Sequence, residues 1–131
     1  TTKEDARFIA MHKDELSKTA MTYAKWIHDP GEHEDRPGQS LATRSHDVIR
    51  HWAEERGAEP ATVPGTEHAG HAGVLRFNFP DYGGKDLETI SWEDWFKSFD
   101  ERQLVFLFQQ HKADGEQSNF FRLDNPDRQD A

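Results

Sequence analysis

The chain has 131 residues, of which 34% are hydrophobic and 11% aromatic, and its formal net charge is −9 at pH 7. This length suits one domain with a sizeable core and excludes a large multi-domain enzyme, and the aromatic content excludes a fully disordered chain. The negative charge disfavours nonspecific binding to nucleic acid or to anionic membranes, because both depend on a positive field.

The first 44 residues predict a helix and a linker. From Lys3 to His28 the apolar residues follow one helical stripe, with Lys, Asp and Glu on the remaining positions. Asp29-Pro30-Gly31 ends this pattern. Segment 31–40 has no periodicity and is heavily charged, so it predicts an exposed linker.

A second helix is predicted from His46 to Arg56. Ser45 can cap its first turn, and Gly57 suits the left-handed residue after its end. Its inner face would be Val48, Ile49, Trp52 and Ala53.

Two strands follow in the prediction. Segment 61–63 is short and apolar, and a loop of small residues comes after it. Segment 74–80 alternates, which predicts a half-buried strand closed by proline, with one side formed by Leu75, Phe77 and Phe79.

The segment 90–123 predicts one more helix and a β-hairpin. Ser91 is a good N-cap, and one face of the helix would be aromatic: Trp92, Trp95, Phe96 and Phe99. Segment 104–109 is rich in strand formers, and Asp114-Gly115 suits a two-residue type I′ turn. That turn pairs Phe108 with Phe121, Phe106 with Leu123 and Leu107 with Arg122. We expect the aromatic helix face to pack on the face formed by Phe106, Phe108, Phe121 and Leu123.

These elements predict an α+β fold with two N-terminal helices followed by a mainly antiparallel β-β-α-β-β unit, whose sheet has three or four strands. We expect residues 1–131 to form a single domain. Within it, residues 1–44 are the N-terminal helix and charged linker, and residues 124–131 a polar tail.

Four motifs give the chain a resemblance to a family of short bacterial proteins of uncharacterised function. They are IRHWAEERG at 49–57, GVLRFNFPDYGG at 73–84, ISWEDWFKSFDE at 90–101, and the final hairpin LVFLFQ…DGEQSNFFRL. The resemblance covers residues 45–123, in the same order of motifs. It implies one fold unit and leaves the function open.

The segment IRHWAEERG is also similar to the first helix of the DNA-binding domain of a family of bacterial nucleoid-associated proteins. In that family an Arg-Gly-Arg loop enters the minor groove after this helix. Here Arg56-Gly57 is followed by Ala58-Glu59, so the second arginine is missing. A DNA-binding surface would use Arg44, Arg50 and Arg56, whose spacing of six does not form one helical stripe.

Two groups of residues have the side chains of metal ligands. Glu67, His68 and His71 lie close together, and imidazoles three residues apart can share a metal when a third ligand arrives. Their small-residue surroundings favour a solvated loop instead. A second group lies at 28–35, where solvated charge is again the simpler interpretation.

No sequence motif of a known catalytic site is present, whether nucleophile elbow, phosphate loop, dinucleotide fingerprint or His-Glu-x-x-His. The chain has no cysteine, which is typical of a cytoplasmic protein. No apolar run approaches the roughly 18 residues of a membrane span, and no signal-peptide core begins the chain. We therefore expect a soluble cytoplasmic protein that needs no cofactor, and the sequence favours a non-catalytic role over an enzymatic one.

The remaining hypothesis is a non-catalytic interaction module that binds a protein partner or itself. Both faces of the last hairpin carry apolar side chains, with Val105, Leu107 and Phe120 on the second face. Aromatic residues and arginine are typical of protein interfaces. The candidate contact residues are Trp26, Tyr82, Trp92, Phe120 and Arg122. The alternatives are a small-ligand or metal-dependent enzyme that uses His68 and His71, and DNA binding through the helix 46–56.

Overall fold

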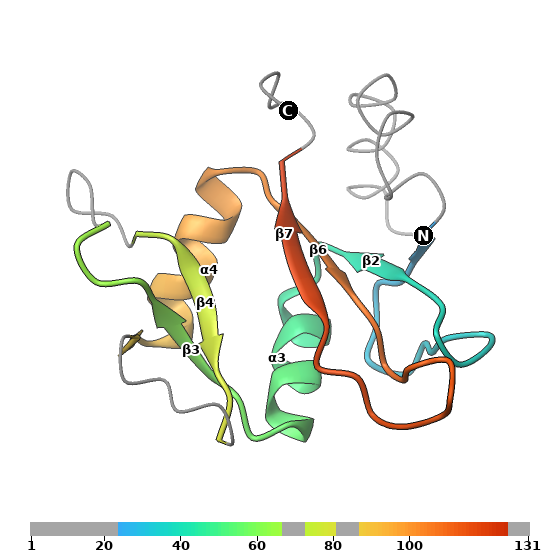
Figure 1. The fold of residues 1–131 in the computed structure, drawn as a ribbon. Helices are drawn as coiled ribbons and strands as arrows, with labels where there is room; N and C mark the ends of the chain where they lie inside the picture. The colour runs from blue at the N-terminus through green and yellow to red at the C-terminus, as the bar shows by residue number, and fades with distance from the viewer. Residues whose placement is uncertain (1–23, 67–72, 81–86, 126–131) are drawn as a thin grey trace. The chain divides into compact units, whose positions relative to one another are not determined.

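The computed structural model describes residues 24–66, 73–80 and 87–125. The chain divides into two compact units, one formed by Thr1–Ile49 and Leu104–Ala131, the other by Arg50–Gln103 (Figure 1). The described residues form helices and two mainly antiparallel sheets, so the fold is α+β. The single-domain organisation stays a prediction.

The first unit contains a four-stranded sheet in the order β1-β2-β6-β7. The short strands β1 (Lys25–Trp26) and β2 (Leu41–Thr43) are parallel, and β2 is antiparallel to β6 (Val105–Phe108). β7 (Phe121–Asp124) pairs antiparallel with β6 and is the last strand of this sheet among the described residues.

Both faces of β6 are buried. Phe106 and Phe108 stack on one face with ring centroids 5.1 Å apart. On the other face Val105 and Leu107 form a cluster with Ala42 of β2, against which Trp26 packs. A strand buried on both faces needs apolar side chains at every position, which explains the unbroken sequence VFLF.

The final hairpin has the predicted register but a different turn. Phe108 pairs with Phe121, Phe106 with Leu123 and Leu107 with Arg122, as expected. A type I′ turn requires a positive φ at both central residues, and Asp114 does not have one, whereas Gly115 has φ +91°. The chain instead turns over three residues, since the Lys112 N–H donates to the Glu116 carbonyl at 2.7 Å.

A bulge restores the register below this turn. The Ser118 N–H donates to the Gln110 carbonyl at 3.1 Å, whereas the Gln109 N–H donates to the Phe120 carbonyl at 3.3 Å. Between these two bonds the chain advances one residue from Gln109 to Gln110 but two residues from Ser118 to Phe120. Asn119 is therefore the extra residue of a β-bulge. The prediction of a two-residue turn was wrong, and the register was correct because the longer turn and the bulge compensate each other.

The last residues of the predicted N-terminal helix form a strand instead of a helix. The helix was expected to run to His28, but residues 25 and 26 form β1, and the N–H groups of Lys25 and Ile27 donate to the carbonyls of Ser40 and Ala42 at 3.0 Å. Pairing with a segment 16 residues away overrides the local helical pattern, which carries no information about that partner. The part of the prediction before residue 24 lies outside the described residues.

Helix α3 (His46–Glu55) was predicted correctly. The Ser45 hydroxyl accepts from the Val48 N–H at 3.3 Å, which caps the first turn. Gly57 follows the end of the helix with φ +67°. The expected inner face is buried, with exposed fractions of 4% or less: Val48, Ile49, Trp52 and Ala53.

The second unit contains a three-stranded antiparallel sheet in the order β4-β3-β5. Its strands are β3 (Glu59–Thr62), β4 (Leu75–Asn78) and β5 (Glu88–Thr89). β3 begins two residues before the predicted strand and includes Pro60. The proline is tolerated because its carbonyl accepts from the Ile90 N–H at 2.9 Å, and its missing N–H falls at the end of the β3–β5 ladder.

Helix α4 (Trp92–Glu101) builds the core of the second unit. The Ser91 hydroxyl accepts from the Asp94 N–H at 3.1 Å, so the predicted N-cap is confirmed. Trp95 is fully buried, its ring stacks on Phe77 of β4 at 5.0 Å, and its indole N–H donates to the Arg76 carbonyl at 3.1 Å.

The β-β-α-β-β arrangement around one sheet was wrong. β3 and β4 belong to the three-stranded sheet and β6 and β7 to the four-stranded sheet. Within its own unit α4 packs on β4, whereas the hairpin that we expected as its partner belongs to the other unit. Among the described residues no helix is long and apolar enough to cross a lipid bilayer.

Candidate functional site

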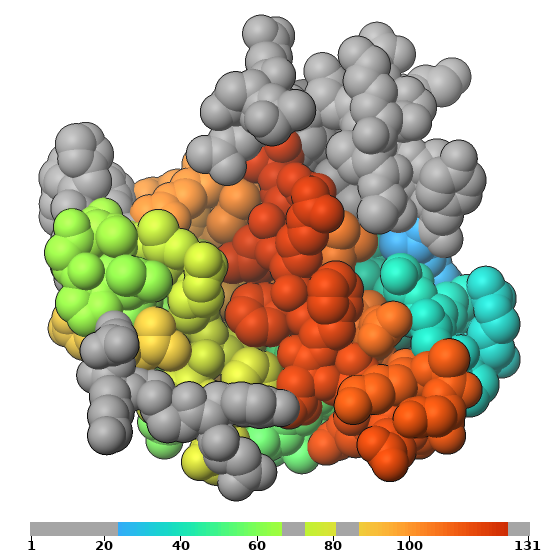
Figure 2. Space-filling view, in the orientation of Figure 1, coloured from blue at the N-terminus to red at the C-terminus, as the bar shows by residue number. Residues whose placement is uncertain are grey.

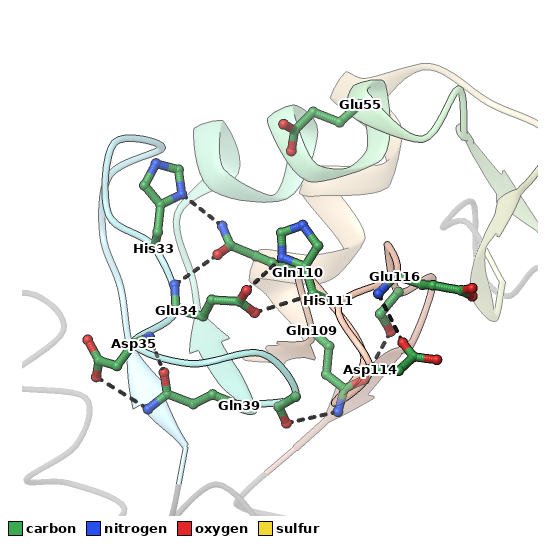
Figure 3. A network of polar contacts seen from close by, with 12 residues as sticks. His33, Glu34, Asp35, Gln39, Glu55, Gln109, Gln110, His111, Asp114 and Glu116 are labelled. Atoms are coloured by element: carbon green, nitrogen blue, oxygen red, sulfur yellow. Dashed lines mark hydrogen bonds and ion pairs between the residues drawn. The ribbon is translucent and has the colours of Figure 1, made fainter.

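A loop and a hairpin connection meet at one end of the four-stranded sheet. The loop of residues 33–39 precedes β2, and the connection of residues 109–120 joins β6 to β7 (Figure 3). Hydrogen bonds between them form what we call the polar network: His33, Glu34, Gly38, Gln109, Gln110, His111 and Ser118.

Glu34 and His111 make the shortest contact of this network. The Glu34 carboxylate accepts from the His111 ring Nδ1 at 2.6 Å and from the His111 backbone N–H at 3.3 Å. The Glu34 side chain is only 11% exposed, whereas the His111 side chain is 47% exposed. A nearly buried carboxylate thus binds the Nδ1 edge of an exposed imidazole, and this bond fixes the orientation of the His111 ring.

Gln110 sets the orientation of the second imidazole. Its Oε1 accepts from the Glu34 N–H at 2.8 Å, so its Nε2 is the atom that lies 3.1 Å from Nδ1 of His33. An amide nitrogen only donates, and Nδ1 of His33 must therefore accept. The neutral rings consequently have opposite tautomers, with the proton on Nε2 of His33 and on Nδ1 of His111.

Gln109 and Ser118 connect this loop to Phe120. The Gln109 amide donates to the Gly38 carbonyl at 3.2 Å and accepts from the Ser118 hydroxyl at 2.9 Å. The same hydroxyl accepts from the Phe120 N–H at 3.1 Å, and Ser118 is 2% exposed. Gly38 has φ +87°, and a Cβ at this position would lie 3.1 Å from the Ala113 backbone.

Segment 31–40 is therefore not the exposed linker that its sequence predicted. Charged side chains in this segment have specific partners. Glu34 pairs with His111, and Asp35 pairs with Lys25 of β1 at 2.9 Å. The hydrogen bond from Lys25 and its positive charge lower the pKa of the Asp35 carboxyl. The signal that could have indicated this docking is the run Gln109-Gln110-His111, three residues that can donate and accept directly after a buried strand.

The chemistry open to the polar network is proton acceptance by Nε2 of His111. Within the described part of the chain this atom has no hydrogen-bonding partner, so no hydroxyl nucleophile is paired with it as in a catalytic dyad. His33 has the wrong tautomer for a metal at Nε2, since a metal-bound imidazole donates from its other nitrogen. No three ligating side chains converge in residues 24–66, 73–80 and 87–125. The predicted metal residues Glu67, His68 and His71 lie outside the described residues.

Phe120 and Arg122 lie side by side on the surface of the four-stranded sheet. They are two residues apart in extended chain, so their side chains leave the same face. Phe120 is 49% exposed and the Arg122 side chain 60%, although Arg122 also lies 3.4 Å from the Asp124 carboxylate. Figure 2 shows the red C-terminal strand as part of the visible surface. We call these two side chains the Phe120 surface.

The other predicted contact residues differ in their environment. Trp26 is half-buried and lies in one row with Ala42, Leu107 and Arg122, so it shares the sheet face of the Phe120 surface. Trp92 belongs to the second unit, where its ring stacks on Phe96 at 5.2 Å. Tyr82 lies outside the described residues.

Two of the three arginines of the DNA-binding alternative, Arg50 and Arg56, belong to the second unit and are engaged there. The Arg56 side chain is 2% exposed, its guanidinium lies 4.4 Å from the Trp52 ring centroid, and it donates to the Trp52 carbonyl at 2.9 Å. Burial lowers its pKa to about 10, against the opposing effect of the Glu55 carboxylate, so it is charged at pH 7. Arg50 pairs with Glu54 at 3.1 Å. A buried Arg56 is not available to enter a minor groove.

Comparison of the chain with protein-family models, with curated proteins and with solved structures gave no match.

Proposed function

We propose that the protein is a non-catalytic interaction module that binds a protein partner through the Phe120 surface. The observation that carries this proposal is the exposure of Phe120, 49%, on a backbone whose N–H and carbonyl are both hydrogen-bonded. The Phe120 N–H is bonded to buried Ser118, and its carbonyl to the Gln109 N–H. An aromatic side chain presented on an ordered backbone loses little conformational entropy on binding.

Arg122 supports the same interpretation. Arginine and aromatic residues are enriched where protein interfaces have their largest binding energies. Trp26 on the same sheet face adds a second, half-buried aromatic ring.

A different protein fits this surface better than a second copy of the chain. Each copy carries a net charge of −9, and two such copies repel each other at low ionic strength. We therefore commit to a heterologous partner, with self-association as an alternative outcome of the experiment.

Site-specific photocrosslinking tests the proposal. A photoreactive phenylalanine analogue is placed at position 120, irradiated in the cells that produce the protein, and the adducts are identified by mass spectrometry. Val74 is the matched control position, because it is the other exposed large apolar side chain among the described residues, at 39%. We expect one dominant adduct from position 120, with a second protein, and none from position 74.

Two outcomes would contradict the proposal. An adduct of twice the 15.2 kDa chain mass would replace the heterologous partner by a second copy. Equal adduct yields at positions 120 and 74 would remove the Phe120 surface as a binding site. As an independent check, Phe120→Ser should abolish capture of the partner identified by crosslinking, whereas Val74→Ser should leave it unchanged.

A further inference from the structure

Phe120 is held on one side by strand pairing and on the other by a side chain. Its carbonyl accepts from the Gln109 N–H in the ladder at 3.3 Å, whereas its N–H has no partner on the neighbouring strand. In an antiparallel ladder the Phe120 N–H would donate to the Gln109 carbonyl, but the bulge at Asn119 prevents this. The Ser118 hydroxyl takes that place and accepts the Phe120 N–H at 3.1 Å. The position of Phe120 therefore depends on where the Ser118 hydroxyl lies.

Gln109 fixes the Ser118 hydroxyl. The hydroxyl donates its hydrogen to the Gln109 Oε1 at 2.9 Å, which leaves a lone pair for the Phe120 N–H. The Gln109 Nε2 donates to the Gly38 carbonyl at 3.2 Å. The chain of bonds thus runs from Phe120 through Ser118 and Gln109 into the loop of residues 33–39, and bonds in such a chain polarise and strengthen one another.

The loop end of this chain is itself held in place. The Gly38 N–H donates to the His111 carbonyl at 2.9 Å, and Glu34 holds His111 from the other side with two hydrogen bonds. Gly38 has φ +87°, and a Cβ at this position would lie 3.1 Å from the Ala113 backbone, so the loop lies close against the hairpin connection at the residue whose carbonyl accepts from Gln109. A substitution that moves Gly38 is therefore expected to weaken the bond to Gln109.

We propose that the loop of residues 33–39 positions Phe120, so that a change at Glu34 or Gly38 alters binding at the Phe120 surface without touching a partner. The effect on binding rests on the proposed function, whereas the effect on the Phe120 backbone does not. Glu34 and Gly38 are positioning residues in this scheme, and Ser118 and Gln109 transmit their effect.

Amide hydrogen exchange tests the positioning. In Glu34→Gln an amide replaces the carboxylate that accepts both His111 bonds, and in Gly38→Ala the loop must move. We expect the Phe120 amide to exchange faster by about tenfold or more in both variants, the change that a loss of about 1.4 kcal/mol produces. Glu116→Gln is the control, because Glu116 is an exposed carboxylate of the same connection outside the polar network.

Amides of β6 show whether the fold is retained. Glu34→Gln lowers global stability, so β6 amides exchange somewhat faster as well, but the Phe120 amide should be accelerated more than they are, and the excess reports a local effect. An unchanged Phe120 amide in either variant, or an equal acceleration throughout β6, would overturn the proposal.

Crosslinking from position 120 then separates this inference from the proposed function. We expect Glu34→Gln to lower the adduct yield at least about threefold, and Glu116→Gln to leave it unchanged. A faster Phe120 amide with an undiminished adduct would overturn the link between loop and binding. If the chain that carries the analogue at position 120 and no other substitution forms no adduct, this counts against the proposed function alone. The exchange experiment needs no partner and is unaffected.

Discussion

Different interactions hold helix α4 and the loop of residues 33–39. α4 buries an aromatic stripe, in which Trp95 and Phe99 are fully buried and Phe77 of β4 lies 5.0 Å from Trp95. The loop buries little apolar surface and is held by bonds from Glu34, Gly38 and the hairpin connection.

This difference governs how each region responds to substitution. The stability of α4 depends on buried apolar volume. A substitution that truncates a buried side chain lowers the free energy of unfolding in proportion to the atoms it removes. The loop depends on single donors and acceptors, and each loss leaves a polar partner without its bond. Truncation of apolar side chains should therefore destabilise α4 most. Small polar or steric substitutions should destabilise the loop of residues 33–39 most.

Trp95→Ala should have the largest effect, about 3–5 kcal/mol lost from the free energy of unfolding. The variant removes a fully buried ring and leaves the Arg76 carbonyl without its indole donor. Denaturant unfolding measures the change, with exposed Lys97→Ala as a control that should cost less than about 0.5 kcal/mol. A wild-type midpoint for Trp95→Ala would show that the aromatic stripe does not stabilise this region.

Gly38→Ala should cost about 2–3 kcal/mol, because a left-handed conformation is strained for alanine and the new methyl group meets a neighbouring backbone. The added Cβ would lie 3.1 Å from the Cα of Ala113. Gly115→Ala is the matched control, since Gly115 also has a positive φ but open space around it. The difference in stability between the two variants, measured by thermal unfolding, gives the steric contribution at Gly38. Equal losses of stability in both variants would show that the loop is not closely docked.

Glu34→Gln should cost about 1–2 kcal/mol, since hydrogen bonds to a charged group are worth more than neutral ones. The substitution keeps the shape of the side chain but replaces the acceptor of the His111 Nδ1–H. Denaturant unfolding of Glu34→Gln and Glu116→Gln measures this cost against an exposed carboxylate. If the two variants unfold at one midpoint, the Glu34 to His111 contact contributes nothing measurable.

Arg56→Lys should have the smallest effect, about 1 kcal/mol, because lysine keeps the charge but loses the planar stacking on Trp52. Arg50→Lys serves for comparison, since the Arg50 side chain is 54% exposed and its pair with Glu54 lies in water. Calorimetric melting temperatures of both variants check the order. If Arg50→Lys lowers the melting temperature more than Arg56→Lys does, then Arg50 and not Arg56 is the arginine that stabilises the fold.

The regions that apolar periodicity governs could be predicted from the sequence. α3 and α4 follow from the spacing of apolar residues, caps and glycines, all of which act over a few residues. The β6–β7 register was correct only because the three-residue turn and the bulge at Asn119 compensate each other. The partner of each buried face could not be predicted in this way. The spacing of Trp92, Trp95 and Phe99 says that one face is buried, yet it does not distinguish β4 from β6 as the strand beneath it.

The candidate site was predicted only in part. Phe120 and Arg122 were expected at a surface from the alternation of the last strand, and they are exposed. The docking of Glu34 was missed, because its partner His111 is 77 residues away and a charged loop has no period that would reveal it. The metal hypothesis for His68 and His71 stays a prediction.

The tryptophans are distributed unevenly between the two units, and this gives each unit its own optical signal. Trp52, Trp92 and Trp95 belong to the aromatic core of one unit, with the rings of Trp92 and Trp95 6.0 Å apart, whereas Trp26 belongs to the other. In a Trp26→Phe variant the indole fluorescence comes from the second unit alone, so its unfolding can be timed separately from that of the four-stranded sheet.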